Sequence, residues 1–135
     1  MKRHMRTLIH ALCLVLVAPV LAGEYAVVVS KATRADKDWQ SVVAVLVKKH
    51  EAIVIEHDGE VAAALGSLRA AFPRYTCFVA TPKEATGVYV AQVHQLTRKL
   101  DADPYTDTFW GILTGYNAAN ALAIAKHSKP LTVRK

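Results

Sequence analysis

Four short apolar runs alternate along the chain with four stretches of helical periodicity. The runs are rich in Val, Ile and aromatic residues. Near-continuous apolar strands separated by amphipathic helices are what a parallel sheet covered on both faces requires, because each right-handed crossover lays a helix over the sheet. The sequence therefore predicts an α/β fold, an open doubly wound parallel sheet of four to five strands with helices on both faces. The four runs span residues 25–30, 52–56, 75–80 and 109–114.

The helical stretches have apolar residues spaced three and four positions apart, which is typical of one buried helix face. Asp36 or Asp38 can cap the first stretch, and Pro73 stops the second. The fourth stretch, residues 118–126, is rich in alanine. The apolar positions are Trp39, Val42, Val43, Leu46 and Val47 in the first stretch, Val61, Leu65, Leu68 and Phe72 in the second, and Tyr89, Val93, Leu96 and Leu100 in the third.

The first 22 of the 135 residues have the parts of a secretory signal. A basic start is followed by an apolar core from Leu8 to Leu21, and small residues precede a cleavage point after Ala22. The alternative is a membrane anchor, but an anchor needs about 20 apolar residues and this core is shorter. The sequence therefore predicts export to the periplasm or the medium, with a signal peptide at 1–22 and one α/β domain at 23–135.

Cleavage changes the charge of the chain. It removes three basic residues and leaves 14 basic against 11 acidic residues, a net charge of +3. This charge gives no reason to expect a nucleic-acid partner. After cleavage we also expect no stable membrane anchor.

The end of the sequence resembles the beginning of another strand. Pro130-Leu-Thr-Val133 has the required residue types, and the chain stops two residues later. We therefore expect the sheet to be incomplete. An unpaired strand at its flank would favour self-association, or binding to the missing remainder of a larger domain.

Ligands of doubly wound sheets bind beyond the carboxyl ends of the strands. Five residues there are candidate ligand contacts. For Asp58, Asn117 and His57 we expect a structural role more strongly, and for Lys31 a surface role equally. Asp58 and Asn117 are well placed as helix caps, His57 as a solvated loop residue and Lys31 as a surface charge. The five candidates are Lys31, His57, Asp58, Tyr116 and Asn117.

The residues alone assemble no catalytic centre. Cys13 would leave with the signal, and Cys77 lies inside a strand, away from the helix end or cation that would activate a thiol. We expect Cys77 to be a buried structural residue. His50 and His57 lack zinc-site spacing, and no nucleotide-binding glycine motif is present. The sequence therefore predicts no catalytic residue, no metal and no cofactor.

Three strings carry a resemblance to a known family. They are residues 25–30, residues 72–75 and, most specifically, Asp103-Pro-Tyr-Thr-Asp107 leading into Trp110-Gly-Ile-Leu-Thr-Gly-Tyr116. Over residues 25–133 the chain resembles the amino-terminal part of exported gingipain-type cysteine peptidases. The resemblance implies a caspase-like α/β fold, with a catalytic His and a nucleophilic Cys in the later half of the catalytic domain. This sequence has no His-Gly pair, and Cys77 does not match the nucleophile, so no catalytic residue is carried over.

These observations lead to two expectations about function. The first is an exported amino-terminal fragment of a gingipain-like cysteine peptidase, inactive alone because it lacks the catalytic His and Cys; whether the chain is itself an enzyme stays open. It would be a truncated gene product or a short paralogue kept for binding, and Pro130–Val133 favours truncation. The second is a small periplasmic or secreted flavodoxin-like ligand-binding module.

Overall fold

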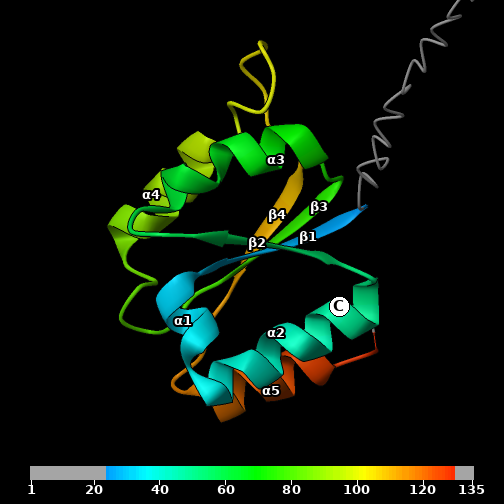
Figure 1. Cartoon of the computed structure of the whole chain (residues 1–135), viewed down its shortest axis with the longest axis vertical. Coiled ribbons are helices and arrows are strands. Elements are labelled where there is room, and N and C mark those ends of the chain that lie inside the picture. The colour runs from blue at the N-terminus through cyan, green and yellow to red at the C-terminus, as the bar shows by residue number, and fades with distance from the viewer. Residues whose placement is uncertain (1–23, 130–135) are drawn as a thin grey trace, which may run out of the picture.

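The computed structural model describes residues 24–129 and contains a four-stranded parallel sheet. The strand order is β2-β1-β3-β4, so the connections run in both directions from β1 (Figure 1). The predicted α/β fold, a doubly wound parallel sheet, is confirmed. The strands are β1 (Tyr25–Ser30), β2 (Ile53–His57), β3 (Tyr75–Val79) and β4 (Phe109–Leu113). The predicted signal peptide and the predicted strand at Pro130–Val133 lie outside the described residues.

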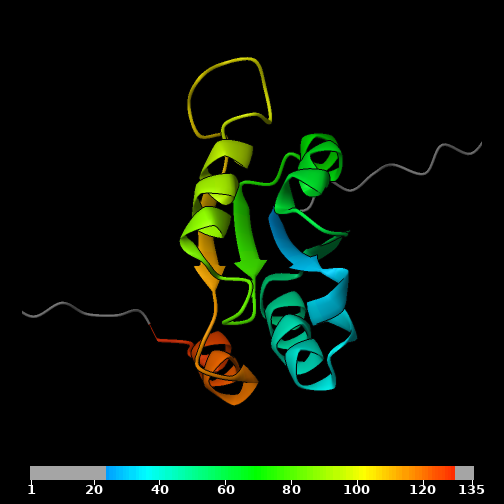
Figure 2. The same cartoon turned by 90° about the vertical axis from the view of Figure 1, so that its left-hand side faces the viewer.

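Helices cover both faces of the sheet, as the alternating pattern predicts (Figures 1 and 2). On one face, α1 (Lys31–Ala35) leads into α2 (Lys37–His50), and α5 (Ala118–Lys126) lies beside α2. On the other face lie the 3-10 helix η1 (Val61–Ala64), α3 (Leu65–Ala71) and α4 (Gly87–Leu96).

The side chains of β1 divide the core into two layers. Ala26 and Val28 pack with α3 and α4, whereas Val27 and Val29 pack with α2 and α5. All four side chains are fully buried, because β1 has a paired strand on each side and a helix layer on each face. This burial explains why the run is apolar at consecutive positions instead of alternating.

The helix boundaries follow local chemistry. Asp36 caps α2 by accepting hydrogen bonds from the backbone N–H groups of Asp38 and Trp39, at 2.9 and 3.3 Å. Lys49 of α2 donates to the carbonyl oxygens of Ala125 and His127, at 3.2 and 2.6 Å, and so fixes the end of α5 against α2.

Two details of the second helical stretch differ from the expectation. The helix begins after Glu60, not at Asp58, and starts with a 3-10 turn. Phe72 is 51% exposed and does not extend the apolar stripe. Its φ of 42° puts it in the left-handed region, where it ends α3 and turns the chain toward β3 before Pro73.

Candidate functional site

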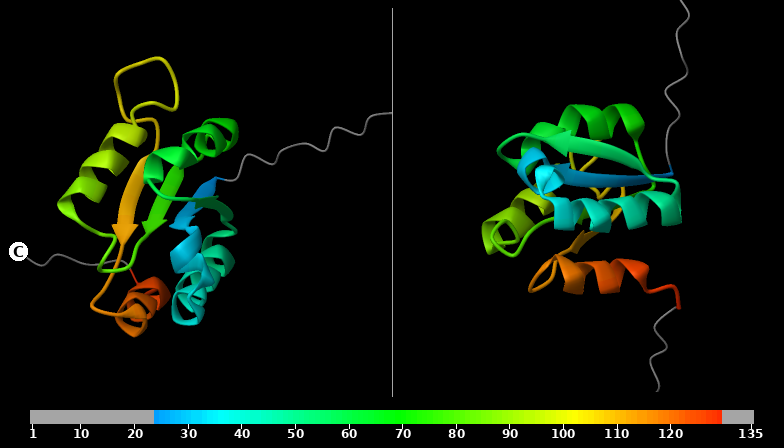
Figure 3. Two further views of the ribbon diagram at one scale, coloured as in Figure 1. Left: turned by 60° about the vertical axis from the view of Figure 1, so that its left-hand side comes forward. Right: turned by 60° about the horizontal axis from the view of Figure 1, so that its bottom comes forward.

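The carboxyl ends of β1 and β3 are the natural place for a ligand. The chain leaves β1 toward β2 on one side and reaches β3 on the other, so their connections diverge at this point of the sheet. Figure 3 presents this edge with the strand arrowheads pointing toward α1 and the loop before α5.

Glu84 is the most highly connected side chain at this edge. Ser30, the last residue of β1, donates its hydroxyl to Oε1 at 2.5 Å, and Thr33 donates to Oε2 at 2.6 Å. Thr81, after β3, donates both its backbone N–H and its hydroxyl to Oε2, at 2.8 and 2.9 Å. One carboxylate therefore ties together the segments that follow two neighbouring strands.

These hydrogen bonds decide the charge of Glu84. Burial alone would raise the pKa of its carboxyl, but the hydrogen bonds from Ser30, Thr33 and Thr81 outweigh burial and hold the pKa below its ordinary value. Glu84 is therefore a fixed negative charge at neutral pH.

His57 is the second notable side chain. It is the last residue of β2 and only 4% exposed, so the expectation of a solvated loop residue is wrong. The alternating pleat of β2 turns its ring, together with Ile55, toward the α3 and α4 face of the sheet. Burial lowers the pKa of His57, against the opposing effects of the Gly59 carbonyl and the charges of Glu84 and Asp58. The ring is therefore neutral at neutral pH.

Both residues line one hollow of about 350 Å³. Its lining residues come mainly from the end of β2, the β2–η1 turn and the start of α4. The lining residues besides His57 and Glu84 are Gly59, Glu60, Val61, Thr86, Val88, Tyr89 and Gln92. A cavity of this size accommodates a small molecule.

The five candidates from the sequence fall into two groups. Lys31 and Asp58 form an exposed ion pair, 3.3 Å between Nζ and Oδ2, next to His57. Asp58 is therefore not the helix cap that the sequence suggests, because the turn at Gly59, with φ of 63°, separates it from η1. Lys31 has the surface position that the simpler expectation gave it.

Tyr116 and Asn117 lie at the other side of the sheet. They follow β4, and three strand spacings, roughly 14 Å, separate β4 from β2. Tyr116 is 97% exposed. Asn117 caps α5 by accepting from the backbone N–H of Asn120 at 2.9 Å, which confirms its structural role. The structure thus brings together Lys31, His57 and Asp58 but not the other two candidates.

Cys77 is buried in the middle of β3, as expected from the sequence. Its side chain faces α2 and α5, on the opposite face of the sheet from His57. Burial raises the pKa of the thiol to about 11. Cys77 therefore has neither an imidazole partner in His57 nor an activated thiolate.

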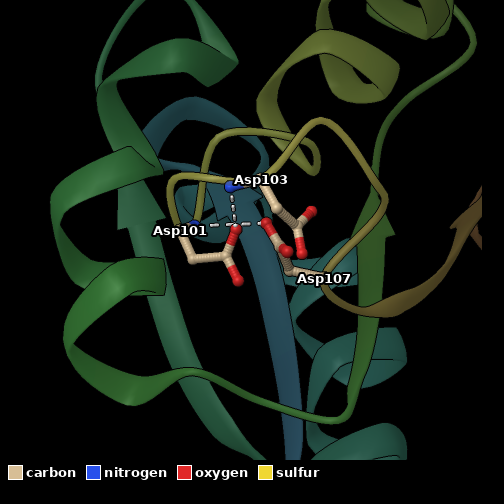
Figure 4. A group of neighbouring side chains, drawn as sticks. All are labelled: Asp101, Asp103 and Asp107. Atoms are coloured by element: carbon tan, nitrogen blue, oxygen red, sulfur yellow. Dashed lines mark hydrogen bonds between the residues drawn. The ribbon is translucent and has the colours of Figure 1, made fainter.

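An acidic loop precedes β4 at the amino edge of the sheet (Figure 4). The carboxylates of Asp101, Asp103 and Asp107 lie within 4.8 Å of one another. Asp107 accepts from the backbone N–H groups of Leu100 and Asp101, and Asp101 accepts from that of Asp103. These bonds fix the conformation of the loop itself, so we assign the carboxylates a structural role.

Glu84 is a site residue that was not among the candidates expected from the sequence. The signal was present as Thr81-x-x-Glu84, the spacing of a capping box, and the two residues do make the reciprocal bonds of that motif. The Thr81-x-x-Glu84 motif is hard to recognise in the sequence, because no long apolar helix pattern begins directly after Thr81.

Comparison with known proteins adds no relative. The chain matches none of the protein-family models, curated proteins or solved structures with which we compared it. None of the described helices combines the length and apolar composition needed to cross a membrane.

Proposed function

We propose that the chain is the amino-terminal part of an exported, gingipain-like cysteine peptidase and has no peptidase activity of its own. The sequence strings at Asp103–Asp107 and Trp110–Tyr116 support the relationship. The parallel sheet with helices on both faces also supports it, because this is the architecture that the resemblance implies.

The position of Cys77 is the main observation that supports the proposed lack of peptidase activity. Cysteine peptidases need a thiolate close to a general base. Cys77 is buried with a raised pKa, and His57 lies across the sheet from it. We therefore assign Cys77 to the core.

The Cys77 thiol should be inert in the native protein. Peptides with Arg, Lys or Asp at the cleavage position should remain intact in the presence of the purified chain. Iodoacetamide should alkylate Cys77 at least about 100-fold more slowly in the native protein than in urea, because a pKa near 11 leaves little thiolate. Thiol-dependent cleavage that Cys77→Ala abolishes would contradict the proposal.

Export is tested at the amino terminus. Expression in a secreting host should give mature protein that begins at Gly23, since the predicted cleavage follows Ala22. Amino-terminal sequencing of the released protein measures this. Intact Met1 in the membrane fraction would favour the anchor instead.

The unpaired outer edge of β4 supports self-association of the chain. Among residues 24–129, β4 pairs only with β3, and Phe109 at its start is 70% exposed. We expect concentration-dependent self-association in sedimentation velocity, because an unpaired strand edge recruits other chains. Phe109→Lys should weaken the association, whereas Tyr116→Lys, at an exposed position beyond the strand, should not. If the wild-type chain is a monomer at all concentrations, self-association through β4 is ruled out.

A second function has its own supporting observation. The strand order β2-β1-β3-β4 matches the first four strands of the flavodoxin-like order. The hollow at His57 and Glu84 lies at the carboxyl edge, where such sheets bind ligands. A ligand-binding module would therefore use this hollow. A thermal-shift screen against nucleotides, flavins, anions and amines tests it, since any ligand of the native state raises the melting temperature.

A further inference from the structure

The outer edge of β4 presents backbone groups to another strand. The N–H of Phe109 and the carbonyl oxygen of Leu113 bond to residues that flank β3. Backbone groups alternate in direction along a strand, so the N–H and C=O groups of Trp110 and Ile112 face away from β3. Within the described part of the chain, β4 has no strand on that side. The outward groups of Trp110 and Ile112 are therefore available for pairing.

The two edges of the sheet differ in charge. β2 forms the other edge and carries Glu56, whose carboxylate lies 3.5 Å from the guanidinium of Arg34. A charged side chain on an edge strand protects it from pairing with other chains. β4 has the sequence Phe-Trp-Gly-Ile-Leu, without a charged residue or a proline. The edge that lacks this protection is therefore that of β4.

The segment of the chain directly after α5 is an unsuitable partner for this edge. α2 connects β1 to β2, and α5 lies beside α2 on the same face of the sheet. Because crossovers between parallel strands are right-handed, a helix on this face leads toward the β2 side of the sheet. A parallel strand that followed α5 and lay beside β4 would need a left-handed connection, which is rare. We therefore expect the partner strand to come from another molecule.

β4 is complementary to itself when two copies run antiparallel around a twofold axis at Gly111, the central residue of the strand. Trp110 of one copy then lies opposite Ile112 of the other, and each such pair exchanges two backbone hydrogen bonds. On the other face of the sheet, Phe109 lies opposite Leu113. Both pairs join an aromatic to an aliphatic side chain, a combination that stabilises neighbouring strands. The second copy would also cover Phe109, which is 70% exposed in the single chain.

The helices on the two faces of the sheet extend this apolar surface. The Asn120 side chain of α5 lies against the turn directly after β4, and Ile124 is one turn further along the same side of α5. On the other face, the ring centroid of His94 in α4 lies 6.3 Å from that of Trp110, and Val90 is one turn before His94. Ile124 and Val90 are 52% and 43% exposed. Joining two copies at β4 would bring both side chains into the contact.

We propose that two copies of the chain associate through β4, antiparallel and around a twofold axis at Gly111, so that their sheets form one continuous sheet. Each copy uses the same surface, as in other twofold dimers. This inference rests on the self-association proposed above and specifies the direction and the register of the paired strands.

Disulfide crosslinking tests the register. Gly111→Cys should form a disulfide-linked dimer, because a residue on the axis faces its own copy and no atom lies within 4 Å of the added carbon. Phe109→Cys alone should give at least about tenfold less dimer, since its two copies are roughly 14 Å apart along the strands. An equimolar mixture of Phe109→Cys and Leu113→Cys should form the mixed dimer. Gly66→Cys, equally uncrowded on α3, is the matched control and should remain a monomer on a non-reducing gel, as should wild type with its buried Cys77.

Hydrogen exchange of the wild-type chain tests the same pairing without a substitution. The outward amides of Trp110 and Ile112 should exchange at least about tenfold more slowly at a concentration where the chain is associated than where it is monomeric. The amide of Gly111 faces β3 and should be protected equally at both concentrations.

Three results would overturn the proposal. Dimer formation by Phe109→Cys but not by Gly111→Cys would mean another register or direction of the strands. Concentration-dependent association with unchanged exchange at Trp110 and Ile112 would mean another surface. A monomer at all concentrations would exclude the dimer, while the proposed inactive peptidase fragment, tested separately by peptide cleavage and amino-terminal sequencing, would stand.

Discussion

Replacing Glu84 with glutamine is expected to lower the free energy of unfolding by about 3 kcal/mol. The carboxylate accepts hydrogen bonds from Ser30, Thr33 and Thr81. Two of the four donors are the hydroxyls of Ser30, the last residue of β1, and Thr33 in α1, and both residues are buried. Glutamine keeps one acceptor oxygen, but its NH₂ group cannot accept and leaves donors unpaired. Urea denaturation followed by circular dichroism measures the change.

Glu60→Gln is the matched control for this substitution. Glu60 lines the same hollow and loses the same charge, but its side chain is exposed. We expect a change of no more than about 0.5 kcal/mol, as for other surface substitutions. Equal effects of the two substitutions would mean that charge, and not the hydrogen-bond network, stabilises this edge.

The same carboxylate makes stability depend on pH. Because folding lowers the pKa of Glu84, its contribution is fully present above the unfolded value near 4.5 and is lost as the pH falls through the folded pKa. Wild type should therefore lose more stability than Glu84→Gln between neutral pH and acidic pH below 4.5. Parallel acid-dependent loss in both proteins would contradict this assignment.

The sheet could be predicted from the sequence because its signals are local. Each strand is a short apolar run, and the helical stripes identify which side chains are buried; Trp39, Leu68 and Val93 all lie in the core. The order of the strands is not determined by local sequence signals. It depends on which crossover goes to which side of β1, and the apolar pattern alone does not specify this.

The candidate site was less predictable because its groups meet only in the folded chain. Glu84 is 54 residues from Ser30 and 51 from Thr33. His57 looks like a polar loop residue in the sequence, but the register of β2 keeps it inside the sheet opposite Ser30. In contrast, Asn117 could be identified as a cap, because its partner is three residues away.

Gly115 illustrates a further requirement that depends on contacts. It lies between β4 and α5. Among the described glycines, only Gly59 has a positive φ, so backbone conformation does not explain Gly115. A Cβ atom at this position would lie 2.7 Å from Oδ1 of Asn120 and 2.8 Å from the backbone nitrogen of Ala121. The first turn of α5 therefore occupies the space of a side chain.

Gly115→Ala is consequently expected to lower the free energy of unfolding by about 2 kcal/mol, the usual cost of overpacking. The Asn120 side chain can rotate away, but the nitrogen of Ala121 can move only if α5 shifts against α2, where Ala121 is fully buried. Gly66→Ala in α3 is the matched control, because no atom lies within 4 Å of the added carbon and alanine favours a helix by up to about 1 kcal/mol. Urea denaturation of both variants measures the difference. Equal stability of Gly115→Ala and wild type would show that the first turn of α5 adjusts freely, and would contradict the close approach as the reason for glycine.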